Sequence, residues 1–202
     1  MHILKVILIL VFIIALLFTG TLLSDKYVLR KQILRMHVIA ASNSSEDQGT
    51  KLRVRDAVLD YLQNIIGDKR DISAVREFIS QEIDTLQAVA NCALMEAGSK
   101  DVAQVTLTLE EFSKREYDTF SLPSGVYESL QIRIGAGEGK NWWCVVFPAL
   151  CTPDTTDTFC STAVSSGFNE GLADTLANDR EYEIRFFILD CLGKIENFLI
   201  FS

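Results

Sequence analysis

The feature that most constrains this chain is an uncharged apolar stretch of 18 residues from Val6 to Leu23. An apolar helix of about 20 residues, rising ~1.5 Å per residue, crosses the hydrocarbon core of a bilayer. The hydrophobic region of a signal peptide is shorter, about 7–15 residues, and small residues follow it at a cleavage site. Because Thr19-Gly20-Thr21 is a poor site of that kind, the length favours an uncleaved anchor over a removed signal peptide.

The N-terminal region is therefore expected to be separate from the rest of the chain. We predict that residues 1–24 are a signal peptide or membrane anchor, with residues 3–23 in the membrane. Residues 25–32 are then a solvated basic stalk next to the membrane, and residues 33–202 form a single domain. A buried helix of a soluble protein is a poor alternative, because the stretch has no polar face.

Two arguments about the orientation of this segment conflict. Lys and Arg tend to stay on the cytoplasmic side of a membrane, which would keep the domain inside. Only Lys5 precedes the stretch, whereas four basic residues follow it, so this rule puts the following domain on the cytoplasmic side. These residues are Lys26, Arg30, Lys31 and Arg35. A short basic leader before the first hydrophobic segment is instead the arrangement of an export signal.

The charge of the domain excludes one class of partner. All 27 acidic side chains and all but one of the 19 basic side chains follow residue 23, so this part carries a formal charge of −9. Such a domain repels the phosphates of nucleic acids, and we expect no nucleic-acid partner.

The hydrophobic periodicity predicts an α+β domain in the order βααβββα, with helices packed on a mixed or antiparallel sheet. Ser45 and Gln48 form a capping-box pattern at the start of the first helix, which Gly67 ends. The expected strands and helices are 33–41, 45–66, 72–97, 102–112, 125–134, 141–148 and 181–199. The glycine-containing segment 135–141 predicts a β-hairpin between its two flanking strands, and 149–178 is expected to be a long loop with at most a short helix.

No motif for a cofactor or metal is present. The glycine-rich segment around Gly137 and Gly139 lacks the spacing of a phosphate-binding loop and leads into a strand rather than a helix. The five cysteines form no CxxC pair, which argues against a metal site. We expect no cofactor, no metal and no small-molecule substrate.

The cysteines leave two possibilities open. Cys144 and Cys151 flank a bend at Phe147-Pro148, and in an exported protein they are the expected disulfide. The alternative is an envelope enzyme in which Cys144 is a nucleophile and His37 its base. A third possibility is a structural module tethered to the membrane.

Two blocks of sequence, LRMHVIAASNSSEDQGTKLRVRDAVL from Leu34 and LPSGVYESLQIRIGAGEGKNWWCVVFPALC from Leu122, carry a family resemblance. The chain resembles stage II sporulation protein R of endospore-forming Firmicutes. The resemblance implies a signalling protein, not an enzyme, that the forespore exports across its inner membrane into the intermembrane space. There, members of the family trigger a membrane-embedded aspartic protease of the mother-cell membrane, which cleaves the precursor of sigma-E. This role favours an exported domain.

The candidate partner-contact residues come from these two blocks. They are His37, Glu46, Asp47, Gln48, Arg55, Asp56, Gly125, Tyr127, Asn141, Trp142 and Trp143. Because side chains alternate along a strand, only one of the two adjacent tryptophan rings is expected to face inward. The other is expected to be exposed and able to anchor a partner.

Overall fold

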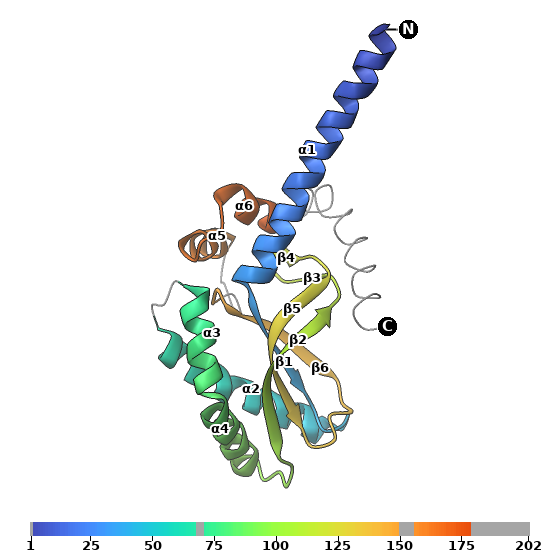
Figure 1. Cartoon of the computed structure of the whole chain (residues 1–202). Coiled ribbons are helices and arrows are strands. Elements are labelled where there is room, and N and C mark those ends of the chain that lie inside the picture. The colour runs from blue at the N-terminus through green and yellow to red at the C-terminus, as the bar shows by residue number, and fades with distance from the viewer. Residues whose placement is uncertain (1, 68–70, 150–155, 179–202) are drawn as a thin grey trace.

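The computed structural model describes residues 2–67, 71–149 and 156–178 and shows an α+β architecture with a mixed sheet, as predicted (Figure 1). The helices are α1 (His2–Gln32), α2 (Ser45–Ile66), α3 (Ile72–Gln81), α4 (Ile83–Glu96), α5 (Thr156–Ser165) and α6 (Glu170–Ala177). The strands are β1 (Leu34–Ile39), β2 (Ala103–Phe112), β3 (Arg115–Glu116), β4 (Ser121–Leu122), β5 (Gly125–Ile134) and β6 (Asn141–Phe147). The expected helix over 181–199 lies outside the described residues.

The main sheet has the order β2-β5-β1-β6. Strand β1 is parallel to β5 and antiparallel to β6, so it separates these two strands. The predicted hairpin between β5 and β6 is therefore wrong. The connection instead crosses the end of β1, where the Glu138 and Gly139 amides donate to the Ala41 and Ala40 carbonyl groups at 3.2 and 2.9 Å.

The start of α2 differs by one residue from the expected capping box. Ser44, not Ser45, is the N-cap, and its hydroxyl accepts from the Asp47 amide at 3.1 Å. The Gln48 side chain does not return to the cap residue but donates to the Ser42 carbonyl at 2.8 Å. The end of the helix at Gly67 is as predicted.

The single helix expected over 72–97 is divided into α3 and α4. Glu82 leaves helical geometry, with φ −98° and ψ 8°. Its carboxylate accepts from the Tyr61 hydroxyl of α2 at 2.8 Å, so a tertiary contact holds the junction. Neither glycine nor proline marks this break, which is why the periodicity did not indicate it.

Helices α2, α3 and α4 cover one face of the sheet (Figure 1). Their apolar stripes pack on every second residue of the strands, as strand geometry requires. The buried members of this core include Leu34, Met36, Val38, Val54, Val58, Leu62, Val75, Ile79, Leu86, Ala90, Leu130, Ile132, Cys144 and Val146.

A second apolar core joins the last turns of α1 to α5, α6 and the β3–β4 hairpin. It contains Leu29, Ile33, Phe112, Phe120, Leu122, Tyr127, Val145, Phe159, Phe168, Leu172 and Leu176. The region 149–178 was expected to be a long loop, but its described part holds two helices. Phe159 and Leu172 are wholly buried, and the weak periodicity around them arises because each helix is short.

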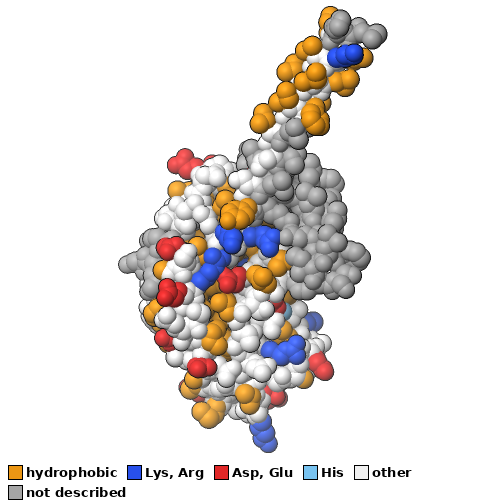
Figure 2. All heavy atoms as spheres, viewed as in Figure 1, with side chains coloured by type: hydrophobic (Ala, Val, Ile, Leu, Met, Phe, Trp, Pro, Cys, Tyr) orange, Lys and Arg blue, Asp and Glu red, His pale blue; other side chains and the backbone are white. Residues whose placement is uncertain are grey.

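Helix α1 extends away from the body, and its apolar side chains at positions 3, 4, 6–14 and 17 are exposed (Figures 1 and 2). Residues 25–32, the expected stalk, continue α1 to the body. Tyr27 and Lys31 are exposed there, whereas Asp25 and Leu29 are buried and the Gln32 amide donates to the Gly167 carbonyl at 3.1 Å. Among the described residues, no helix meets the combined length and hydropathy required to cross a bilayer.

We predict that Gly139→Ala lowers the free energy of unfolding by about 1–3 kcal/mol, because a Cβ at this position would lie 2.2 Å from the Ser42 carbonyl oxygen. Gly49→Ala is the control, since a Cβ there meets no atom within 4 Å and alanine favours the interior of α2. The control should be stabilised by about 0.5–1 kcal/mol. Urea unfolding measures both, and equal effects would contradict the close crossing over β1.

Candidate functional site

The residues selected from the sequence blocks fall into two groups in the structure. One group surrounds the start of α2 and the segment before β6, and we call it the α2-start cluster: Ser42, Asp47, Gln48, Lys51, Arg55, Lys140 and Trp142. The other lies on the sheet face opposite α2, and we call it the sheet-face cluster: Arg35, His37, Glu110, Ser129, Gln131 and Trp143.

The α2-start cluster connects the helix to the crossing segment. The Lys51 ammonium donates to the Gln48 side-chain oxygen at 2.7 Å and to the Lys140 carbonyl at 2.9 Å. Lys51 is buried, and this burial, with the charges of Arg55 and Lys140, lowers its pKa. Asp47 accepts from the Ser42 hydroxyl at 2.5 Å. These residues hold α2 against the segment that leads into β6.

The Arg55 guanidinium lies 4.8 Å from the centre of the Trp142 ring and pairs with Asp56 at 2.7 Å. Trp142 packs against the core beneath the helices, whereas Trp143 faces the other core. The alternation is as expected, but both rings are half-buried, so the prediction of one exposed ring is wrong. Glu46, Asp56 and Asn141 are the exposed members of the predicted set.

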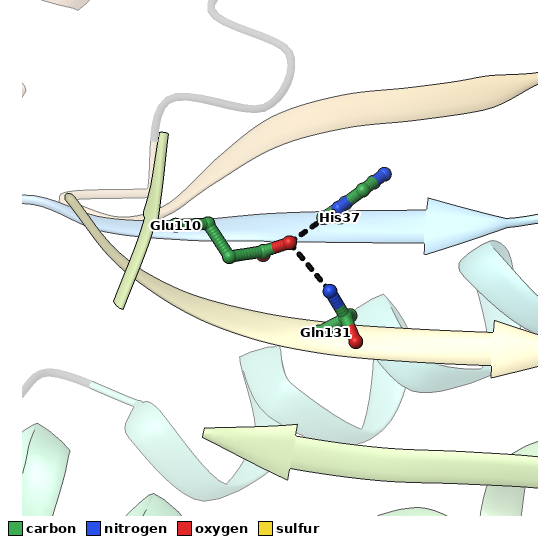
Figure 3. Close-up of polar contacts among 3 residues, drawn as sticks. All are labelled: His37, Glu110 and Gln131. Carbon is green, nitrogen blue, oxygen red and sulfur yellow. Dashed lines mark hydrogen bonds and ion pairs between the residues drawn. The ribbon is translucent and has the colours of Figure 1, made fainter. Parts of the chain in front are cut away.

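The centre of the sheet-face cluster is a histidine–carboxylate pair (Figure 3). His37 Nδ1 lies 2.9 Å from Glu110 Oε1, which also accepts from Gln131 Nε2 at 2.5 Å. The His37 ring stacks on Trp143, with centroids 3.6 Å apart and an angle of 20° between the planes. Strands β1, β2, β5 and β6 thus supply one residue each.

The environment of Glu110 favours its charged form. Burial raises the pKa of this carboxyl, but hydrogen bonds from His37, Ser129 and Gln131 and the charge of His37 more than offset burial, so the pKa lies below its usual value. An ionised Glu110 can only accept a hydrogen bond, so His37 Nδ1–H is the donor. His37 Nε2 is then available as a hydrogen-bonding atom, and it is buried without a partner among the described residues.

Arg35 lies two residues before His37 on the same face of β1 and is wholly buried. Its Nη2 donates to the Tyr117 hydroxyl at 2.9 Å, and its guanidinium carbon lies 3.8 Å from the centre of the Phe112 ring. Burial lowers the pKa of this guanidinium, although Tyr117 and Tyr127 partly offset the effect. Arg35 was counted with the basic residues that follow the apolar stretch, but the structure places it in the interior.

The two remaining motif residues shape this face. Tyr127 is buried, and its hydroxyl donates to the Pro123 carbonyl at 2.8 Å. Gly125 begins β5 and pairs with Phe112. Sequence reasoning missed Arg35, Glu110, Ser129 and Gln131. Alternation along 102–112 and 125–134 is consistent with the last three sharing one sheet face but gives no sign of the pairing across strands.

The structure does not bring Cys144 and His37 together. Cys144 packs in the core beneath the helices, while His37 lies on the opposite face of the sheet. Cys144 is also disulfide-bonded and therefore has no free thiol. The pairing with Cys151 remains a prediction, because Cys151 lies outside the described residues.

The described cysteines and carboxylates provide no metal centre. Cys92 and Cys160 are free. In the described ranges, no group of three or more His, Cys, Asp or Glu side chains is arranged to hold a metal ion. The sheet-face cluster is therefore a hydrogen-bonding and charged site built from one carboxylate, one imidazole and one guanidinium.

We predict that Glu110→Gln lowers the free energy of unfolding at pH 7 by about 1–3 kcal/mol, the value typical of hydrogen bonds to a charged group. A carboxyl with a lowered pKa in the folded state stabilises the protein above its unfolded value of about 4.3. This contribution is lost as the pH falls through the folded value.

The difference between wild type and the variant should thus shrink between pH 7 and pH 3 in urea unfolding. Glu111→Gln, a change of the exposed neighbouring carboxylate, is the control and should have little effect at either pH. An equal loss of stability for Glu110→Gln at both pH values would contradict the pairing with His37.

Comparisons with known proteins address the family of the chain. The family model described as stage II sporulation protein R matches residues 30–157. The stage II sporulation protein R of Bacillus subtilis strain 168 is 32% identical over 127 residues, which cover 63% of this chain and 57% of that relative. No solved structure matches. The family model covers more than half of the chain and includes both clusters, so the chain belongs to the stage II sporulation protein R family.

Proposed function

We propose that this protein is an exported sporulation signal that activates a membrane-embedded aspartic protease. In this proposal the forespore exports it across its inner membrane, and the domain acts in the intermembrane space. The protease lies in the mother-cell membrane and then processes the precursor of sigma-E. The protein itself acts by contact and performs no catalysis.

The observation that carries this proposal is membership of the stage II sporulation protein R family. The family name places the protein in sporulation, and the specific role in protease activation follows from the resemblance noted in the sequence. The matched region in the Bacillus subtilis protein is 57% of its length, so the activity of that whole protein is part of the proposal.

Two structural features are consistent with a role by contact. The polar residues of the α2-start cluster are engaged in bonds that hold the fold, such as those of Lys51 to Gln48 and Lys140. Helix α1 is continuous: its N-terminal part carries exposed apolar side chains, and its last turns are packed against the body. If residues 3–23 enter the membrane, this continuity gives the domain a defined position at the membrane surface.

The rival function, an envelope enzyme that uses Cys144 and His37, loses its geometric basis because the two side chains lie on opposite faces. A structural module tethered to the membrane remains the other alternative. It predicts no effect on processing of the sigma-E precursor.

We predict that the full chain, the protease and the sigma-E precursor together suffice for precursor cleavage in a heterologous membrane system. Immunoblotting of the precursor measures the outcome. Omitting either the chain or the protease should abolish cleavage, and so should replacing the catalytic aspartate of the protease. Cleavage without the chain, or none when all three components are folded and present, would contradict the proposal.

The same system separates activation from a cysteine enzyme. Cys144→Ala should reduce cleavage only in proportion to the loss of folded protein, because Cys144 is buried and disulfide-bonded. Cys92→Ala, a change of an exposed free cysteine, is the matched control and should leave cleavage unchanged. Complete loss of activity in a folded Cys144→Ala protein would favour the enzyme.

A further inference from the structure

The sheet-face cluster contains an unusual concentration of buried polar atoms that lack a partner. In the described part of the chain they include Arg35 Nε and Nη1, His37 Nε2 and Glu110 Oε2, with Gln32 Oε1 at the end of α1. Arg35 and Ser129 are directly opposite in the register of β1 and β5. Buried polar groups are nearly always hydrogen-bonded, so such a group calls for an explanation.

The charge at Arg35 is the most unfavourable element of this arrangement. A guanidinium stays ionised in proteins, and burial of an unpaired charge costs several kcal/mol. Among the described residues, the contacts of Arg35 are the Tyr117 hydroxyl and the rings of Phe112 and Tyr127, none of which is an anion. The carboxylate of Glu110, on the same sheet face, pairs with His37 through Oε1.

We propose that Arg35 forms a recognition site for a carboxylate group supplied by a ligand or by an acidic side chain of a binding partner. The guanidinium nitrogens Nε and Nη1 provide two donors for its two oxygens. A carboxylate brings one negative charge, which matches the one unpaired guanidinium. A phosphate dianion would bring a second charge close to the ionised Glu110, so the site favours a carboxylate.

The open part of the same sheet face offers a route to this site. Thr106 and Thr108 of β2 are exposed, and they lie opposite Gln131 and Ser129 in the register of β2 and β5. On the other side, Arg35 is covered by Tyr117, which follows the two-residue strand β3. Such a short ladder is weak, so a carboxylate oxygen can replace the Tyr117 hydroxyl as the acceptor of Nη2.

The test is an acetate titration of the full chain, labelled with ¹⁵N-arginine, in nanodiscs of zwitterionic lipid. The Nε–H resonances are followed by NMR, with sodium chloride at equal ionic strength as the reference. We expect a saturable shift of the Arg35 resonance and none for the exposed Arg133, whose Nη1 donates to the Ala136 carbonyl. A separate arm with a glutamate-rich peptide determines whether a polypeptide side chain reaches the site as free acetate does.

Two hydroxyl deletions sharpen the test. Tyr117→Phe removes the hydroxyl that accepts from Arg35 Nη2 and should lower the acetate concentration at half-saturation several-fold. Tyr127→Phe is the matched control, because its hydroxyl donates to Pro123, and it should leave the half-saturation point unchanged. An unsaturable response, an equal response to chloride, or tighter binding of inorganic phosphate than of acetate would overturn the proposal.

A stability readout distinguishes recognition from a purely structural role of Arg35. Arg35→Met removes an unpaired buried charge, so we expect Tm in the absence of acetate to rise by about 3–6 °C. The rise in Tm that acetate gives to the wild type should be absent in this variant. A folded Arg35→Met protein with a lower Tm and an intact acetate response would overturn the proposal. These measurements are made without the protease, so their result does not depend on whether the proposed function is correct.

Discussion

The structure depends on the burial of β1 between two strands of opposite direction. All six of its residues are buried, and it pairs with β5 on one side and β6 on the other. Its alternate residues therefore point into the buried regions on the two opposite faces of the sheet. Leu34, Met36 and Val38 pack beneath the helices, whereas Arg35 and His37 enter the opposite face.

This position of β1 explains why the candidate site is polar and buried at once. His37 obtains a carboxylate from β2 and an aromatic ring from β6, so three strands share one hydrogen-bonded and stacked unit. Arg35 contacts aromatic rings and a hydroxyl, and the described residues place no carboxylate in an ion pair with it. The sheet thus buries an apolar core on the face beneath the helices. On the other face it buries polar atoms that have no partner among the described residues, and these atoms are suited to bind a partner group.

Local patterns in the sequence were sufficient for the α+β class, the helix 45–66 and the strands near 33–41, 102–112 and 125–134. They failed where distant contacts decide the structure. The break at Glu82 depends on Tyr61, and the separation of β5 from β6 depends on β1 lying between them. Arg35 was counted among the basic residues that follow the apolar stretch, although its place in the strand 33–41 puts its side chain on the face opposite to Leu34 and Met36.

We propose that the domain acts on the protease by direct contact and that the sheet face makes this contact. Hydrogen exchange of the full chain in nanodiscs, with and without the protease in the same membrane, tests it most directly. The account predicts slower exchange in β2 and in the hairpin of β3 and β4, with no change in α2, α3 and α4. Protection confined to those helices, or no protection anywhere while the precursor is being cleaved, would contradict the account.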